Sequence, residues 1–420
     1  MNALTAGATA FLSRFEGLRG QLPGPAALRE DGAALLRARG LPGRRVEEWR
    51  YTDLGALAQI GFTEALTEAA EHPALPPMRA SHRAVFVDGR FAPHMSSLPA
   101  WAASLAARLA DAAPLLRGAE GQPLAALNAM LWEDGLFLDL PAGTQGGTLE
   151  LLSVAAHAGR PIAFHPRHVL RLAEGASLTL LETSLGPAGA TYLHNPVFDI
   201  TVAGGATLTH VRVQREGRSA FHLATVRAAV AGGGTYDSFT LNAGARLARG
   251  EMHVALNGPK AAAHLNGAQL AAEGQHADIT TFLDHAAPDC PSRQTVKTVL
   301  AGRARGVFQG KILVRQAAQR TDGYQMNQAL LLSEEAEINA KPQLEIYADD
   351  VKCSHGATVG ALDADSLFYL RSRGIPEAQA KAMLVEAFLH EAVETVTDET
   401  LRTALTRALD NWWARQEAAA

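Results

Sequence analysis

Apolar and polar side chains alternate along short segments through the middle of the chain. Phe198, Ile200 and Val202 are separated by Asp199 and Thr201. This period of two is typical of a strand that buries one face and exposes the other. The middle of the chain is therefore predicted to consist of short strands.

Turns rich in glycine and other small residues separate these segments and recur at a regular distance. They lie at residues 173–177, 202–207, 230–235 and 256–260. A period of about 25–30 residues without intervening helices is typical of the coils of a β-solenoid. A β-sandwich shows the same alternation, but with shorter and less regular spacing. We predict a mainly β fold with a right-handed parallel β-helix core.

Helical periodicity is confined to the two ends of the chain. We expect an N-terminal helical region over residues 1–75 and a mixed α/β connecting region over 76–147. The β-helix core would then cover 148–365, followed by a C-terminal helical region over 366–420. A chain of 420 residues is long enough for several such substructures.

Composition narrows the class of protein. The 38 basic and 43 acidic residues give a net charge of −5 without a basic block, which argues against nucleic acid as a partner. Two cysteines exclude a disulfide framework and are typical of a reducing compartment. No apolar run approaches the roughly 18 residues of a membrane span, and Arg14 and Glu16 interrupt the early hydrophobic segment. We expect a cytoplasmic protein without membrane contact.

Two side chains that can bind metal lie two positions apart near the end of the predicted β-helix. They are Cys353 and His355. On one strand both would leave the same face, about 6–7 Å apart at Cα. A nucleophile and its base need a contact of about 2.6–3.2 Å, whereas two ligands can lean towards one metal more easily. The alternative is that the cysteine is an ordinary core residue and the histidine is only hydrogen-bonded.

This pair is too small to form a metal site alone. Structural zinc and iron–sulfur clusters usually have four protein ligands. The other cysteine, Cys290, lies far upstream. We therefore expect another chain or a small thiol to supply the missing ligands.

Several stretches share a distinctive sequence with a known family. The segments 318–323, 330–334, 341–358 and 367–375, together with Glu47–Thr52, closely resemble the SufB/SufD family of iron–sulfur cluster assembly proteins. Within that family they resemble the SufD branch most.

The resemblance implies a β-helix that acts as a non-catalytic scaffold subunit. Such a subunit pairs with SufB, binds the ATPase SufC, and contributes to iron entry and cluster assembly at the SufB–SufD interface. The chain alone would hold no cofactor. Iron or an iron–sulfur cluster would lie transiently at the interface, with Cys353 and His355 as ligands, and ATP would enter only through SufC. A homodimer is the alternative when the chain is alone.

The resemblance also implies that the C-terminal helical region binds SufC. Candidate partner-binding residues are Tyr369, Arg371, Arg373, Leu384 and Phe388. The alternatives are that the apolar residues pack on the body of the protein and that the arginines form a solvated basic face.

Other functions are disfavoured by specific residues. A SufB-type paralogue would be expected to have an acidic residue at the position of His355 and more cysteines. A β-helix enzyme acting on polysaccharides would need sugar-stacking aromatics, and only 6% of residues are aromatic.

The stretch Gly306–Ile312 resembles a phosphate loop, but it is one residue short and has isoleucine in place of the magnesium-binding Ser/Thr. We therefore expect no ATP hydrolysis by this chain, and no nucleotide-binding motif supports a flavin.

Overall fold

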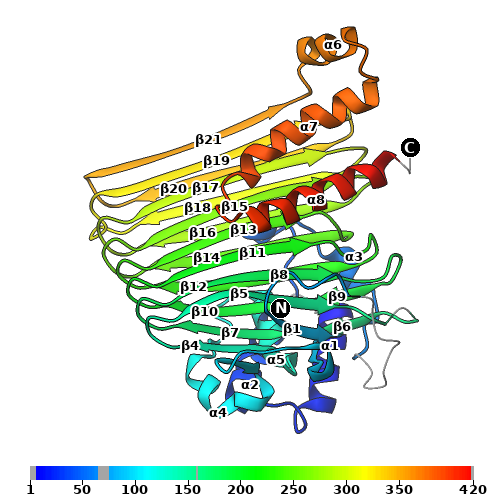
Figure 1. Ribbon diagram of the computed structural model, residues 1–420. Coiled ribbons are helices and arrows are strands. Elements are labelled where there is room, and N and C mark those ends of the chain that lie inside the picture. The colour runs from blue at the N-terminus through cyan, green and yellow to red at the C-terminus, as the bar shows by residue number, and fades with distance from the viewer. Residues whose placement is uncertain (1–5, 65–74, 158, 418–420) are drawn as a thin grey trace.

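The core of the protein is a parallel β-solenoid in which the chain passes alternately through two facing sheets (Figure 1). The computed structural model describes residues 6–64, 75–157 and 159–417. Helices lie at both ends of the chain. The predicted fold class, a mainly β solenoid with N-terminal and C-terminal helices, is confirmed.

Strands that are next to each other in one sheet belong to successive coils. The first sheet has the order β2 (Arg90–Phe91), β1 (His82–Val87), β5 (Gln145–Val154), β8 (Ser177–Leu185), β11 (Thr207–Gln214), β13 (Thr235–Asn242), β15 (Ala262–Ala271), β17 (Pro291–Leu300), β19 (Thr321–Leu331) and β21 (Val351–Gly360). The second sheet has the order β20 (Glu337–Ile346), β18 (Arg305–Val314), β16 (His276–His285), β14 (Leu247–Leu256), β12 (Phe221–Val230), β10 (Val197–Val202), β7 (Arg167–Leu172), β4 (Leu136–Leu140) and β3 (Ala102–Ser104). Two short strands, β6 (Ile162–Phe164) and β9 (Tyr192–His194), extend the second sheet beside β12.

The coils have a nearly constant length. From β4 onward, residues that pair in register on successive coils are 26 to 32 positions apart in the sequence. The sheets already include β1 and β4, so the solenoid extends upstream of residue 148.

The inner faces of the two sheets form the main hydrophobic core. Phe198, Ile200 and Val202 of β10 point into it and are almost completely buried. Asp199 and Thr201 leave the opposite face, as strand alternation requires. Thr201 is exposed, but Asp199 is buried because the N-terminal part of the chain covers it.

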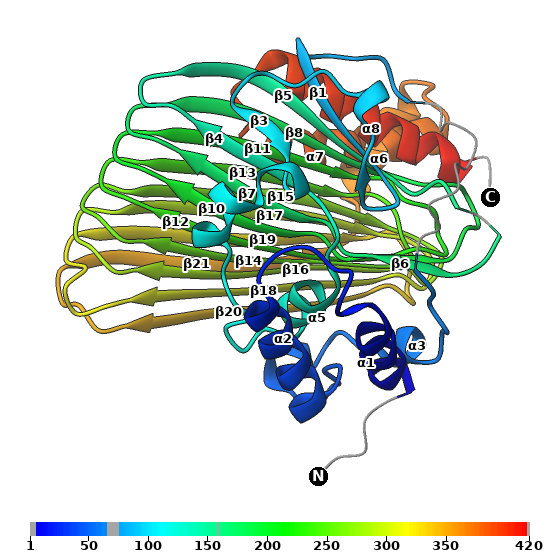
Figure 2. The ribbon, with the colours of Figure 1, turned by 90° about the horizontal axis from the view of Figure 1, so that it is seen from below.

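The N-terminal segments pack on the outer face of the second sheet (Figure 2). They contain α1 (Ala6–Leu18), α2 (Ala26–Arg39), η1 (Glu47–Trp49), α3 (Gly55–Ala58), η3 (Ala106–Arg108), α4 (Leu109–Ala112), η4 (Ala113–Leu115) and α5 (Pro123–Leu131). The short helix η2 (Pro93–Met95) instead lies beside β1 of the first sheet. Residues 65–74 of the predicted N-terminal region lie outside the described residues. Trp49 is buried, and its ring lies 3.9 Å from the guanidinium carbon of Arg249 on β14. This cation–π contact attaches η1 to the sheet.

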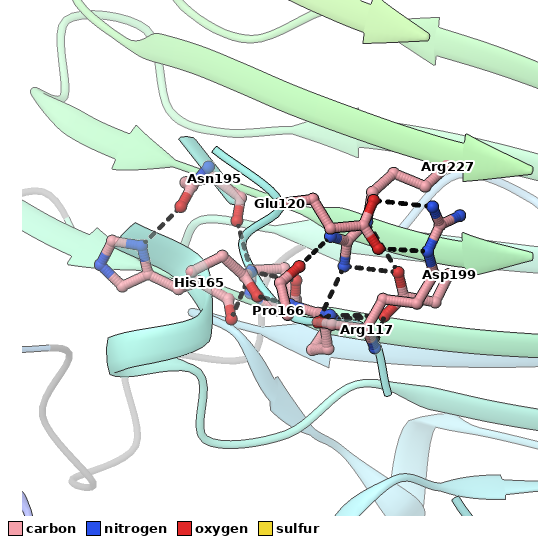
Figure 3. Close-up of polar contacts among 10 residues, drawn as sticks. Arg117, Glu120, His165, Pro166, Asn195, Asp199 and Arg227 are labelled. Atoms are coloured by element: carbon pink, nitrogen blue, oxygen red, sulfur yellow. Dashed lines mark hydrogen bonds and ion pairs between the residues drawn. The ribbon is translucent and has the colours of Figure 1, made fainter. Parts of the chain in front are cut away.

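A buried ionic network fixes the loop before α5 to the same sheet (Figure 3). The Asp199 carboxylate accepts a 2.8 Å hydrogen bond from Arg167 and a 2.9 Å hydrogen bond from Arg227. The two guanidinium groups also donate to the backbone carbonyl of Arg117, at 2.6 and 3.1 Å. All three charged side chains of the network are almost completely buried. Each charge therefore depends on the others for compensation.

Three C-terminal helices follow the solenoid: α6 (Ala364–Ser372), α7 (Glu377–Val393) and α8 (Glu399–Glu417). The apolar faces of α7 and α8 pack against the outer face of the first sheet. Figure 2 shows them on the side of the solenoid opposite the N-terminal helices. Of the helices that the structure describes, each is too short or too polar to cross a membrane.

The buried network predicts a large difference between two Asp-to-Asn substitutions. Asp199→Asn leaves two buried guanidinium groups without a counterion and should lower the free energy of unfolding by about 3–5 kcal/mol. Asp139→Asn removes a partner of Arg171 at a pair that is partly exposed, and should cost less than about 1 kcal/mol. Urea unfolding of both variants measures the difference. Similar losses in the two variants would contradict the role given to Asp199.

Candidate functional site

The solenoid ends in two long strands that have neighbours on one side only. β21 pairs in parallel with β19, and β20 pairs in parallel with β18. Among the described residues, neither has a strand on its other side. Both strands are ten residues long, and Figure 1 shows them at the end of the stack furthest from β4. This open end therefore presents unpaired backbone groups from both sheets.

Apolar side chains that a further coil would cover are exposed at the open end. Ile346 on β20 pairs in register with the buried Val314, yet it is 39% exposed. Val359 on β21 is 55% exposed, and Tyr347, just after β20, is 64% exposed. The open end is thus an apolar rim bordered by two unpaired strand edges.

The predicted pair lies on the edge strand of this rim. Cys353 pairs in register with Gly323 on β19, and His355 pairs with Gln325. Because they are two positions apart on one strand, both side chains leave the same face. Cys353 is half-buried against an apolar cluster that includes Ile312, whereas His355 is exposed. Neither residue is sealed in the core.

The surroundings of Cys353 keep its thiol protonated. Burial raises its pKa above the usual range, and the nearby carboxylate of Asp322 raises it further. Cys353 also lines a shallow groove of about 310 Å³ at the edge of β21, where Arg293 and Asp322 form a 2.8 Å ion pair. A metal that binds Cys353 must therefore displace a proton.

Polar side chains continue inward from His355 between the two sheets. Gln294, Gln325 and His355 occupy the same register position on three successive strands. The amide groups of Gln325 and Asn327 are buried, and neither has a hydrogen-bond partner among the described residues. The sequence interpretation missed these two residues. Strand alternation could have identified them, because it places these two polar residues at inward-facing positions of the strand before the Cys–His segment.

Close packing across the sheets accommodates the Gln325 side chain. A Cβ placed on Gly310 of β18 would lie only 1.6 Å from Gln325 Nε2. The stretch that resembles a phosphate loop, residues 306–312, lies within this β18 strand and forms no loop.

The predicted partner-binding residues fall into two groups. Tyr369, Arg371 and Arg373 lie on or just after α6, a helix in which no residue is buried. The guanidinium of Arg373 lies 5.0 Å from the Tyr369 ring, and Arg371 forms a 3.4 Å ion pair with Glu377. Exposed side chains thus gather on a helix that projects beyond the solenoid (Figure 1).

The other two residues lie on α7 and are half-buried. Phe388 packs on the first sheet, with Lys297 Nζ 4.4 Å from its ring centre. Leu384 lies one turn earlier on the same helix. Phe388 therefore attaches α7 to the solenoid. The sequence interpretation missed Phe368, which is 73% exposed beside Tyr369.

Comparison with known proteins gives a consistent result. A family model described as SUF system FeS cluster assembly, SufBD core domain, matches residues 154–388. The chain is 35% identical over 373 residues to the iron–sulfur cluster assembly protein SufD of Escherichia coli, which covers 88% of each chain. It is 33% identical over 410 residues to an iron–sulfur cluster assembly SufBD family protein of Synechocystis, covering 91% of this chain and 89% of the relative.

The thiol environment predicts how the two cysteines react. Cys353 should react faster with iodoacetamide than Cys290, which is fully buried in the core. Because the pKa of Cys353 is raised, its labelling rate should still be rising above about pH 9. Mass spectrometry of the two labelled peptides gives both rates. Equal rates, or a Cys353 rate that is constant from neutral pH upward, would contradict this description.

Proposed function

This chain belongs to the SufBD family of iron–sulfur cluster assembly proteins, and we propose that it is a SufD-type, non-catalytic scaffold subunit whose open solenoid end pairs with SufB. The observation that supports this most is the open end itself, where an apolar rim and two unpaired strands surround Cys353 and His355. The family assignment disfavours the alternative of a polysaccharide-active enzyme.

The two ends of the solenoid differ in a way that favours pairing at only one of them. At the first end, the sheets finish in β2 and β3, which are two and three residues long and run antiparallel to their neighbours. Short edge strands of this kind discourage further pairing. At the open end, β20 and β21 are each ten residues long. A second solenoid of similar width can continue both sheets or cover the apolar rim.

The metal chemistry follows from the number of donor atoms. Cys353 supplies a sulfur and His355 an imidazole nitrogen, which suit iron or an iron–sulfur cluster. Four ligands are usual, so SufB would supply the others at the junction. The iron or cluster is cargo that forms at the interface and leaves it, and this chain alone would hold none.

The ATPase SufC would dock on the projecting helix α6. This helix buries none of its residues and exposes Phe368 and Tyr369, which are suitable anchors for a protein interface. Only residues 361–363 separate α6 from the end of β21. ATP-driven movement of the docked ATPase would therefore act directly on the edge strand that carries Cys353 and His355.

Substitution of the candidate ligands tests the role of the open end. His355→Ala and Cys353→Ser should each lower cluster formation by the complex with SufB and SufC at least about tenfold, because a donor atom is lost. Co-purification of the three proteins should be unchanged. Anaerobic iron and sulfide analysis together with maturation of a client protein measures the effect. His264→Ala, on the outer face of β15, is the matched control and should behave as the unaltered protein. Undiminished maturation in His355→Ala would remove the case for a ligand role.

The docking role of α6 has a separate test. Phe368→Asp should weaken binding of SufC at least about tenfold, since an exposed aromatic anchor is replaced by a charge. Met78→Asp changes another exposed apolar residue far from α6 and should leave binding unaffected. Isothermal titration with purified SufC compares the two variants. Equal affinities would place the ATPase elsewhere on the chain.

A further inference from the structure

We propose that His194, Glu216 and His222 form a second, buried site that binds a divalent first-row transition-metal cation, Zn²⁺ or Fe²⁺. One donor atom from each of the three residues lies within 4.8 Å of the other two. All three residues are buried. Two imidazoles and one carboxylate are a donor set that both cations accept. This inference stands on the donor set and does not depend on the proposed role of the open end.

The fold brings the three residues together by strand register. β9 and β12 are parallel neighbours, and His194 pairs directly with His222. Residues in direct register on adjacent strands leave the same face, so the two imidazoles are side by side. Their ring centres are 4.9 Å apart and the rings are nearly perpendicular. Glu216 lies on the segment between β11 and β12 and reaches both rings.

The distances already approach those of a metal site. His194 Nδ1 lies 3.1 Å from one Glu216 oxygen, and His222 Nδ1 lies 2.7 Å from the other. Metal–ligand bonds of about 2.0–2.2 Å place neighbouring donor atoms about 3–3.5 Å apart. Small movements of the side chains would therefore admit a cation between them.

One ring nitrogen that faces the site lacks a hydrogen bond. His222 Nδ1 is close to Glu216 but is not aligned with it, and it has no hydrogen-bond partner among the described residues. A buried imidazole nitrogen without a partner is the observation that a bound cation would explain.

The charge of Glu216 gives an independent argument. The structure places His194, His222, Gln214 and the Tyr192 hydroxyl against this buried carboxylate. By contrast, the buried carboxylates Asp199 and Asp278 are each held by arginine. A divalent cation would compensate the Glu216 charge without requiring either histidine to be protonated.

The cluster has space for one further ligand. A polar cavity of about 10 Å³, lined by residues that include Gln214 and His222, lies between the sheets beside it. This volume is about that of a single water molecule. On another side the Phe164 ring stacks on His194 with centres 4.8 Å apart and excludes solvent. The arrangement fits a site with three protein ligands, one water and no sulfur ligand. A cation bound there would join two coils of the solenoid.

Metal analysis of the purified full-length chain tests the site. The chain is prepared without an affinity tag, as a Cys353→Ser/His355→Ala variant that lacks the open-end ligands. It is purified anaerobically from medium supplemented with zinc or iron and dialysed against EDTA. We expect about one metal ion per chain to be retained, because the site is buried. His222→Gln in this background should reduce the retained metal at least fivefold. His264→Gln, which alters a half-exposed histidine near Asp237, should retain it.

A spectroscopic measurement covers the case in which His222→Gln does not fold. The background variant is produced in cobalt-supplemented medium, and its visible spectrum is recorded. We expect the d–d bands of Co²⁺ bound to nitrogen and oxygen, without a thiolate-to-cobalt charge-transfer band. Three results would each overturn the proposal. They are retention of less than about 0.2 metal ions per chain in the background variant, equal retention in a folded His222→Gln variant, and a thiolate-to-cobalt band.

Discussion

A solenoid built from parallel coils leaves the outer backbone N–H and C=O groups of its last strands without hydrogen-bond partners. Every interior coil receives hydrogen bonds and apolar contacts from a coil on each side, but the final coil has a neighbour on one side only. At the first end the chain avoids the problem with the short antiparallel strands β2 and β3. At the other end β20 and β21 are long, and no further strand of the described part of the chain lies beside them. Cys353 and His355 lie on this edge, and the proposed pairing with SufB would place them at the junction.

The remainder of the structure holds the coils in a fixed arrangement. Apolar contacts attach the flanking helices to the outer faces of the two sheets, and buried charges strengthen this attachment on the N-terminal side. Asp199 connects two arginines to the loop before α5, while Arg249 is held by Glu251 and Asp278 and stacks on Trp49. Such networks are sensitive to the loss of any member, because an unpaired buried charge is costly. They hold the N-terminal helices on one face, while α7 and α8 cover the other.

The sequence allowed the fold to be predicted because its signals are local. Alternation in β10 and the recurrence of small-residue turns both follow from strand geometry and coil length. Burial of Asp199 could not be predicted in this way, since alternation assigns it to solvent and only the tertiary fold covers it. Phe388 illustrates the same difficulty, because a helical stripe does not distinguish packing on Lys297 from partner binding. The His194, Glu216 and His222 cluster depends on the register of β9 with β12, which no local pattern contains. By contrast, Cys353 and His355 could be recognised because both lie on one strand.

Hydrogen exchange of the backbone amides at the open end tests the central claim most directly. Exchange is measured for this chain alone and for the chain in complex with SufB. Mass spectrometry then gives the exchange rates of peptides from β20, β21 and the interior strand β13. If the open end is the pairing surface, exchange in β20 and β21 should slow at least about tenfold in the complex, because edge amides gain partners or lose solvent, and β13 should change little. Complex formation that leaves exchange in β20 and β21 unchanged would contradict the account.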